Sequence, residues 1–413
     1  MADCLLRCAL CGREFKPENH VKTCPDCGID GTMHVLYDYD EAKKRVGRKE
    51  LAASFDFSLW RYSALLPVKE GARRPSLQVG WSPLYSSSGI ARDYGVREVL
   101  VKDDGRNPTA SLKDRASCIA VTLALQEGQE TVACASTGNA ASSLAGFAAN
   151  VGLRSVIFVP EAAPAAKVTQ LLVFGAKVFL VRGDYAATVR LAIEAIERWG
   201  WYDRNCAINP FLVEGKKTCA MEIAEQCGWD VPDKVFVSVG DGCIISSTYK
   251  GFYDLHRVGL IDRIPQIIGV QAEGASPIHQ AVQSGAKKVV FGPSHTVADS
   301  IDVGAPHNWA KALNAVRSSH GDTVAVSDGE ILAALAELPR RSGVFAEPAA
   351  AAAYAGFVRM AREGRLKASD RIAVIVSGNG LKDVAAAQEA VSPAKKIAPD
   401  MAALESALEF GNP

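Results

Sequence analysis

The sequence predicts an α/β protein made of two three-layer α/β/α domains with mostly parallel sheets, preceded by a small cysteine-rich ribbon. Two features of the 413-residue chain support this prediction. From about residue 95 onward, short apolar strands alternate with helix-length segments, a pattern typical of parallel sheets with helical crossovers. The first 27 residues hold five of the eleven cysteines. A chain of this length is expected to form two to three domains of about 100–200 residues each.

The N-terminal cysteines form two CxxC pairs with twelve residues between them, at Cys8, Cys11, Cys24 and Cys27. Four thiolates at this spacing suit the tetrahedral coordination of zinc, and a complete set of four leaves no open position for catalysis. A glycine follows each pair, as a tight turn favours. We therefore expect a structural zinc ribbon over residues 1–35. The alternative is four thiols without a metal.

The remaining chain divides into four predicted segments. Residues 36–94 form a connector, with a helix at 40–53, and the first part of a larger domain. Residues 95–215 form a smaller α/β domain, residues 216–395 form the larger one, and residues 396–413 end in an amphipathic helix at 400–410. Apolar runs predict strands at 99–101, 131–135, 155–160, 177–181, 234–239, 267–271 and 371–376, and helices at 111–126, 140–151, 166–174 and 185–198.

Composition argues against several classes of function. Lys+Arg and Asp+Glu both number 46, so the net charge is zero, which argues against a nucleic-acid partner and against binding to an anionic membrane. The sequence contains no apolar run long enough to span a bilayer and no secretory signal at its N-terminus. The cysteines beyond the ribbon are scattered singly, as buried thiols in a reducing compartment are, so we expect a cytoplasmic protein.

The strongest candidate for chemistry is Lys113, in the stretch Asn-Pro-Thr-Ala-Ser-Leu-Lys-Asp-Arg over residues 107–115. It stands near the predicted start of a helix, whose positive end lowers the pKa of an amine. A neutral lysine amine can form an imine with an aldehyde cofactor such as pyridoxal phosphate. The alternative is an exposed lysine on a helix face, and the neighbouring motifs decide between the two.

Three turns, each after a predicted strand, supply what such a cofactor and its substrate need. Residues 136–142 open a helix with hydroxyls and backbone N–H groups that suit a substrate carboxylate, although simple helix capping would also explain the hydroxyls. Residues 240–244 place glycines where the backbone can approach a phosphate. At residues 377–380 a hydroxyl rather than a carboxylate follows the strand, which suits a neutral pyridine nitrogen.

Together these segments resemble the fold-type II pyridoxal-phosphate enzymes of the tryptophan synthase beta-like superfamily, and the threonine synthase family in particular. The resemblance runs from about residue 80 to the C-terminus. It includes the lysine segment, the 136–141 loop, the Asn-Pro…Glu-Gly-x-Lys-Thr motif at 209–218 and the turn at 377–383. The N-terminal ribbon is also similar to that of some threonine synthase-like enzymes. The resemblance implies a pyridoxal-phosphate-dependent carbon–oxygen lyase that acts on a small amino-acid substrate, with a homodimer as the expected assembly.

The resemblance also implies roles for individual residues. Lys113 would link covalently to the cofactor and shuttle protons. The cofactor-binding set would be Lys113, Asn139, Gly240, Asp241, Gly242, Cys243, Ile244 and Ser377. The substrate-binding set would be Ser136, Thr137, Gly138, Asn139, Leu212 and Asp302.

Two positions depart from the family pattern. Threonine synthases usually have an arginine where Leu212 stands, and often another where Asp302 stands. Both changes remove a cation that could bind a substrate phosphate. The implied reaction is the conversion of O-phosphohomoserine to threonine. The alternative is replacement or elimination on an O-substituted serine, as in a cysteate synthase or an ammonia-lyase. A non-catalytic zinc-ribbon paralogue is the alternative from a different class, and a complete cofactor frame around Lys113 argues against it.

Overall fold

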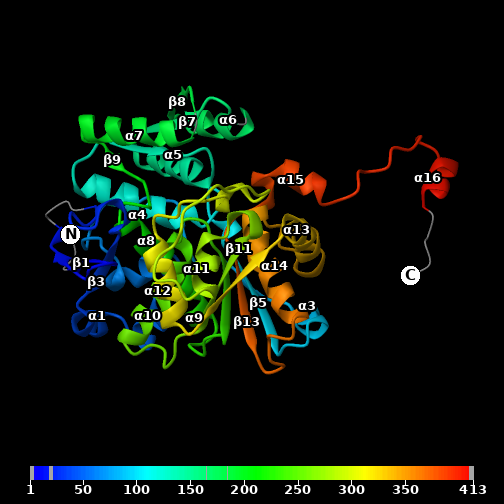
Figure 1. The fold of residues 1–413 in the computed structure, drawn as a ribbon, viewed down its shortest axis with the longest axis horizontal. Coiled ribbons are helices and arrows are strands. Elements are labelled where there is room, and N and C mark those ends of the chain that lie inside the picture. The colour runs from blue at the N-terminus through cyan, green and yellow to red at the C-terminus, as the bar shows by residue number, and fades with distance from the viewer. Residues whose placement is uncertain (1–3, 18–21, 164, 184, 409–413) are drawn as a thin grey trace.

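The computed structural model describes residues 4–17, 22–163, 165–183 and 185–408, and these residues fold as an N-terminal ribbon and two sheets covered by helices (Figure 1). The ribbon has three antiparallel strands, β1 (Cys4–Cys8), β2 (Glu14–Phe15) and β3 (Met33–Tyr37), in the order β2-β1-β3. Alternate residues of β1 and β3 are buried, so one face of the ribbon packs against the rest of the protein.

The connector after the ribbon forms two short helices, α1 (Tyr39–Arg45) and α2 (Arg48–Ala53), and a 3₁₀ segment, η3 (Leu59–Leu65). The single helix predicted at 40–53 was therefore wrong. The backbone is extended at Val46 and Gly47, so the first helix ends there. Glycine is a poor residue for a helix interior, which favours the break.

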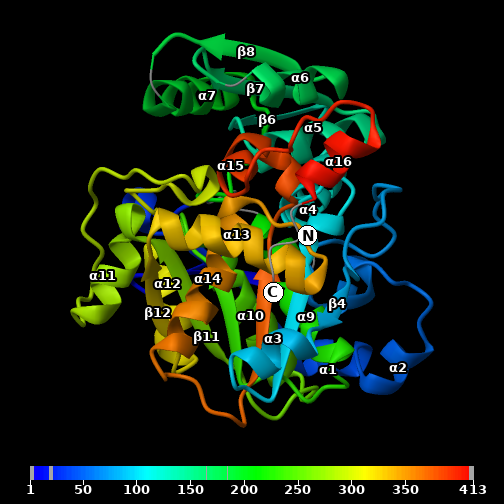
Figure 2. The same ribbon diagram turned by 90° about the vertical axis from the view of Figure 1, so that its right-hand side faces the viewer.

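The larger sheet has six strands in the order β12-β11-β10-β13-β5-β4, and only the edge strand β4 runs antiparallel to its neighbour (Figure 2). Its strands are β4 (Leu84–Ser86), β5 (Glu98–Asp103), β10 (Lys234–Ser238), β11 (Gln266–Ala272), β12 (Asp322–Val326) and β13 (Arg371–Val376). Side chains of each central strand alternate between two separate apolar cores. On β13, Ile375 faces one core and Val374 the other. The sheet is therefore the middle of three layers, as predicted.

Two sets of helices cover this sheet. One face is packed by α9 (Thr218–Gln226), α10 (Cys243–Arg257), α11 (Pro277–Gln283) and α12 (Trp309–Ser318). The other face is packed by α3 (Ser88–Asp93), α13 (Asp328–Ser342) and α14 (Pro348–Arg362). The alanine-rich start of α14 is fully buried, because small side chains allow the helix to approach the sheet closely.

The smaller sheet has four parallel strands in the order β8-β7-β6-β9, and it lies at the top of Figure 1. Its strands are β6 (Thr131–Ala135), β7 (Arg154–Pro160), β8 (Lys177–Val181) and β9 (Tyr202–Asp203). On one side lie α4 (Lys113–Gln126), α5 (Asn139–Val151) and α6 (Ala165–Val173), and on the other lies α7 (Tyr185–Trp199). The short helix α8 (Phe211–Lys216) packs on α4.

One strand lies in a different sheet from the one expected. The strand predicted at 99–101 was placed with the smaller domain, but β5 pairs with β13 in the larger sheet. Buried apolar side chains cover both faces of β5, which suits an inner strand of either sheet, so hydrophobicity did not distinguish them. The predicted segment 95–215 therefore spans both sheets.

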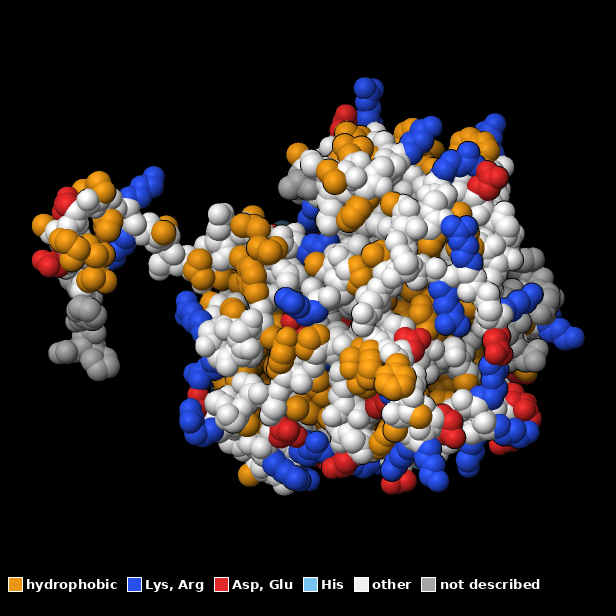
Figure 3. Space-filling model, turned by 180° about the vertical axis from the view of Figure 1, so that it is seen from behind, with side chains coloured by type: hydrophobic (Ala, Val, Ile, Leu, Met, Phe, Trp, Pro, Cys, Tyr) orange, Lys and Arg blue, Asp and Glu red, His pale blue; other side chains and the backbone are white. Residues whose placement is uncertain are grey.

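The chain ends in α15 (Val384–Glu389) and α16 (Met401–Ala407). Helix α16 stands away from the body on an extended segment, with apolar side chains on its surface (Figure 3). It covers most of the helix predicted at 400–410, whose last two residues lie outside the described part. Among the described helices, none is long and apolar enough to cross a membrane.

A buried polar cluster connects the end of the ribbon, at Tyr37 and Tyr39, to helices α8 and α10. The Tyr37 hydroxyl donates to Glu214 (2.8 Å), and the Tyr39 hydroxyl donates to Asp254 (2.7 Å). Lys217 lies between these carboxylates and pairs with both, and its ammonium stands 4.2 Å from the centre of the Tyr37 ring. Since buried charges are stable only when paired and hydrogen-bonded, the two tyrosines complete the cluster.

Candidate active site

The predicted lysine segment connects β5 to α4, and Lys113 is the first residue of that helix. The turn before it is held by Asp114, whose carboxylate accepts a hydrogen bond from the backbone N–H of Thr109 (2.6 Å). Ala110 adopts a left-handed backbone conformation with φ of 66°, which is unfavourable for a residue with a Cβ. Such strain persists where surrounding contacts fix the backbone, and it is frequent at functional sites.

Arg115 anchors the start of α4 through buried ion pairs. Its guanidinium is fully buried and donates to Asp104 (2.7 Å) and Glu222 (2.8 Å). Lys102 on β5 also donates to Glu222 (2.7 Å). The Asp-Arg pair that follows Lys113 in the sequence is therefore a rigid support for the lysine rather than part of the reacting set.

The lysine segment and the Ser377 turn are joined by backbone hydrogen bonds. The N–H of Leu112 donates to the carbonyl of Ser377 (2.8 Å), and the N–H of Asn379 donates to the carbonyl of Ala110 (3.1 Å). The hydroxyl of Ser111, in the same crossing, is buried and has no hydrogen-bond partner in the described part of the chain. Two segments far apart in the sequence therefore lie side by side, where the strands β5 and β13 both end.

The carboxylate loop lies beside the same turn. Residues 136–138 follow β6 and are partly exposed, and Asn139 begins α5. The Asn139 amide donates to both carboxylate oxygens of Glu347 (2.8 and 2.9 Å). Glu347 precedes α14, and its side chain makes no capping hydrogen bond to the described residues of that helix. A Cβ at Gly378 would lie 2.1 Å from this carboxylate, so only glycine fits there.

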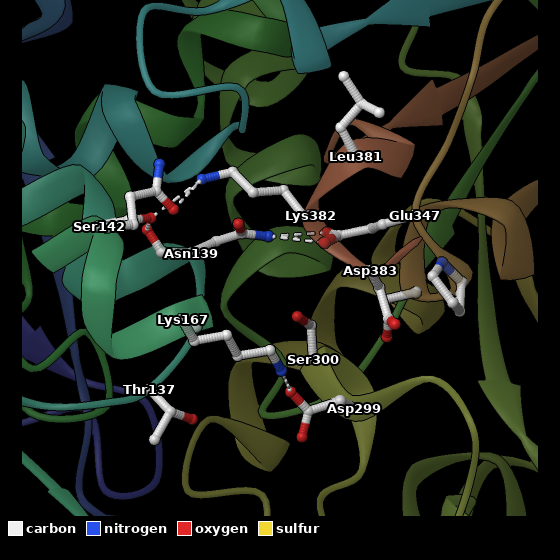
Figure 4. A pocket seen from close by; sticks show the side chains of 14 residues that line it. Thr137, Asn139, Ser142, Lys167, Asp299, Ser300, Glu347, Leu381, Lys382 and Asp383 are labelled. Carbon is white, nitrogen blue, oxygen red and sulfur yellow. Dashed lines mark hydrogen bonds and ion pairs between the residues drawn. The ribbon is translucent and has the colours of Figure 1, made fainter. Parts of the chain in front are cut away.

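These side chains line a cleft between the two sheets (Figure 4). Lys382 reaches across it to the hydroxyl of Ser142 (3.2 Å), and Lys167 on α6 pairs with Asp299 (2.5 Å). Lys382 also donates to Gln170 (3.1 Å), so these contacts and the Asn139–Glu347 pair cross the cleft from both sides. A cleft at the carboxyl ends of parallel strands is the usual ligand position in α/β folds.

The glycine turn after β10 has the geometry of an anion site. Gly242 has φ of 97°, and a Cβ there would lie 2.8 Å from the carbonyl of Asn308. It directly precedes the fifteen-residue helix α10, whose first N–H groups have no side-chain cap. Asp241 is turned aside, because its carboxylate accepts from the N–H of His307 (2.8 Å) and the amide of Asn308 (2.7 Å). The free N–H groups therefore suit a phosphate.

Lys113 is surrounded by charged groups on both sides. Burial, together with the charges of nearby Lys216 and Arg204, lowers its pKa to about 8, while Glu347 and Cys206 oppose the shift. Glu347 belongs to the carboxylate-loop side, and Cys206 touches the glycine turn through Cys243, whose thiol donates to the Cys206 carbonyl (3.4 Å). Lys113 therefore lies between the two predicted subsites, with an amine that is easily deprotonated.

The two positions that depart from the family pattern have different surroundings. Leu212 has no exposed surface and packs in the core of the smaller domain, so in the structure it contacts apolar side chains rather than the cleft. Asp302 follows η6 (Asp299–Ile301), which borders the cleft, and one of its carboxylate oxygens is buried without a hydrogen-bond partner among the described residues.

Sequence reasoning missed three buried cations that act on Lys113 or on the neighbouring Cys206. They are Arg204, Lys216 and Lys311, which are 2%, 2% and 4% exposed. Arg204 donates to the backbone carbonyl of Lys113 (3.2 Å). The available signal was weak: Arg204 directly follows β9, a strand of two residues that no apolar run predicted.

The four predicted metal ligands do come together. The sulfur atoms of Cys8, Cys11, Cys24 and Cys27 all lie within 4.8 Å of one another. Both following glycines have positive φ, as tight knuckle turns require. All eleven cysteines belong to the described residues, and no disulfide joins any of them.

The residues of the site fit pyridoxal phosphate. The unpartnered Ser111 hydroxyl, the uncapped N-terminus of α10 and the low pKa of Lys113 each leave a group that the cofactor would satisfy. Lys113 would hold the aldehyde, the turn at 240–244 the phosphate, and Ser377 the ring nitrogen.

Comparison with known proteins agrees with this chemistry. The family model "Pyridoxal-phosphate dependent enzyme" matches residues 75–378, so the chain is a pyridoxal-phosphate enzyme by class. Threonine synthase from Methanocaldococcus jannaschii is 39% identical over 407 residues, which cover 98% of this chain and 99% of that protein. Threonine synthase from Methanosarcina acetivorans is 39% identical over 92% of each chain. The chain therefore belongs to the threonine synthase family of pyridoxal-phosphate-dependent lyases.

A solved structure supports the fold. The processed form of threonine deaminase isoform 2 from Solanum lycopersicum superposes with a TM-score of 0.65 at 23% identity, over 76% of this chain and 88% of that chain. This likeness confirms the fold-type II architecture expected from the sequence.

Proposed function

We infer that this enzyme converts O-phosphohomoserine to threonine, with pyridoxal phosphate on Lys113 and zinc at the four ribbon cysteines. The supporting observation is the near full-length identity to threonine synthases, together with a buried lysine of low pKa between two anion-binding turns. The free thiols and the lack of charge bias fit a cytoplasmic enzyme, and a homodimer is the proposed assembly.

The residues around Lys113 have separate roles in such a reaction. The bound cofactor supplies an electron sink for negative charge at the substrate Cα. The amine of Lys113 removes the Cα proton and then moves a proton at Cβ, for which a pKa near working pH is suited. The hydroxyls and N–H groups of residues 136–139 hold the substrate carboxylate. Glu347 fixes the Asn139 amide so that this helix start stays in place.

Water must reach Cβ only after phosphate has left Cγ, so the site has to close around the substrate. The contacts Lys167–Asp299 and Lys382–Ser142 already bridge the cleft from opposite sides. We assign them the role of holding the cleft closed and limiting the access of water during turnover.

The test is a panel of substrates given to the cofactor-loaded enzyme. It comprises O-phosphohomoserine, O-phosphoserine with and without sulfite, O-acetylserine, serine and threonine, and both the amino-acid product and released phosphate are measured. Threonine formed in equal amount to phosphate supports the proposal. Cysteate from O-phosphoserine and sulfite, or keto acid and ammonia from serine or threonine, as the main activity would overturn it.

The role of Lys113 is tested by borohydride reduction followed by peptide mass spectrometry. The cofactor mass should appear on the peptide that contains Lys113, and Lys113→Ala should abolish both this label and turnover. Exposed Lys288 offers a matched control, because Lys288→Ala should change neither.

A further inference from the structure

The three buried cations around Cys206 come from separate elements. Arg204 follows β9, Lys216 ends α8, and Lys311 lies on α12. The guanidinium of Arg204 stands 3.6 Å from the sulfur of Cys206 and donates to the Ser117 hydroxyl (3.1 Å). Each of the three cations is more than nine-tenths buried. The cluster therefore lies inside the protein, on the glycine-turn side of the lysine.

These cations lack the partners that buried charges need. Lys217, next in sequence to Lys216, pairs with Glu214 and Asp254. Among the described residues, Arg204, Lys216 and Lys311 form no ion pair with a carboxylate, and Lys216 is hydrogen-bonded to the Cys206 thiol instead. A buried cation without an anionic partner is costly, so this arrangement favours the presence of a bound anion.

The nearest carboxylates are already committed to other groups. Glu214 accepts from Tyr37 and pairs with Lys217. Asp241 is held by the N–H of His307 and the amide of Asn308. Neither carboxylate is free to turn toward the cations.

The Cys206 thiol responds to the positive charge of the cluster. A hydrogen bond with Cys243, and then the charges of Lys216 and Arg204, hold the pKa of Cys206 well below its ordinary value. Burial lowers the pKa of Lys311 to about 8, although several anionic groups oppose the shift. The cluster thus stabilises negative charge on a group as weakly acidic as a thiol.

The position of Lys216 relates the cluster to the substrate tail. Lys216 lies four residues after Leu212 on the same short helix, so the two share a face about 6 Å apart. Leu212 is buried in the core, whereas the charge of Lys216 acts on Lys113 and Cys206. A cation one turn further along α8 therefore faces the reacting lysine.

We propose that Arg204, Lys216 and Lys311 form a receptor for an anionic group at the end of the substrate side chain, distinct from the backbone turn that takes the cofactor phosphate. The group is of the phosphoryl or sulfonyl type, because three converging donors match its several oxygens. This inference rests on the proposed function, since it assigns the tail of the same substrate.

The experiment uses the cofactor-loaded enzyme and inorganic phosphate or sulfate as probe. Binding is measured by calorimetry for the wild type and for Lys216→Met, Lys216→Arg, Lys311→Met and the exposed control Lys288→Met. Phosphate should bind to the wild type, and each buried methionine substitution should weaken it at least about tenfold. Lys216→Arg should recover part of the affinity, and Lys288→Met should match the wild type. Circular dichroism and cofactor content confirm that each variant is folded and loaded.

Kinetics separate this receptor from the proposed reaction. If the lysine variants raise KM for the phosphorylated substrate by a similar factor, with kcat less affected, the receptor is supported. If threonine forms and these variants leave KM unchanged, the receptor is refuted while the function stands. If phosphate binding depends on the lysines but no threonine forms, the receptor stands and the proposed function fails. Loss of cofactor affinity with unchanged phosphate affinity would assign the cations to the cofactor and overturn the proposal.

Discussion

The protonation of Lys113 gives the most direct quantitative prediction. Free lysine has a pKa of 10.5, and in this site burial and the neighbouring cations lower it to about 8. At pH 7 an ordinary lysine is neutral in only about 0.03% of molecules, whereas a pKa of about 8 makes about 9% neutral. Since only the neutral amine attacks an aldehyde, Lys113 should capture the cofactor roughly 300 times faster at pH 7 than an ordinary lysine.

The assay is the rate at which cofactor-free enzyme binds pyridoxal phosphate, followed by absorbance between pH 6 and 10. The rate should rise with pH and level off above about pH 8, because the neutral fraction rises through the pKa and then saturates. Removing one nearby cation with Lys216→Met should move this midpoint to higher pH. The charged groups that face Lys113 in addition are Arg204, Glu347 and Cys206, and they remain in that variant.

Two outcomes would contradict the lowered pKa of Lys113 or its cause. A rate that still increases steeply up to pH 10 in the wild type would mean that Lys113 titrates as an ordinary lysine. An unchanged midpoint in Lys216→Met would mean that the amine of residue 216 does not act on Lys113. Lys288→Met serves as the control for a charge removed far from the site.

Three further perturbations test the supporting structure. Glu222→Gln removes the negative charge that pairs with buried Lys102 and Arg115, so it should lower the free energy of unfolding by about 3–5 kcal/mol in urea titrations. Glu130→Gln, at a surface ion pair, should change it by less than about 1 kcal/mol. Cys24→Ser should reduce zinc, measured by elemental analysis, from one atom per chain to none, and Cys227→Ser should leave it at one. Glu347→Gln removes one of the two acceptors of the Asn139 amide and should lower kcat/KM about tenfold, and an unchanged value would show that this contact does not orient the loop.

Much of the fold was predictable because the signals were local. The strands of β6, β7, β8, β10, β11 and β13 are apolar runs that begin and end within two residues of their predicted bounds. The CxxC spacing predicted a cluster that the structure contains. The assignment of β5 to the wrong sheet shows the limit, because strand pairing depends on contacts with β13, more than 260 residues away.

The candidate site was predictable where a motif follows a strand and not where a contact joins distant segments. Lys113, the 136–139 turn, the 240–244 turn and Ser377 converge because parallel strands end at a common edge. Glu347 and Lys311 carry no local signal, since each stands in an ordinary helical context. Leu212 was assigned by analogy with relatives, and only packing reveals that it faces the core.

Tyr37, at the end of the ribbon, connects it to helix α8. Its hydroxyl is hydrogen-bonded to Glu214, and Glu214 lies two residues before Lys216 on α8. A chain that lacked residues 1–39 would leave Glu214 and Lys217 without the Tyr37 hydroxyl and ring. Loss of the ribbon would therefore disturb the short helix that carries Lys216, whose charge lowers the pKa of Lys113.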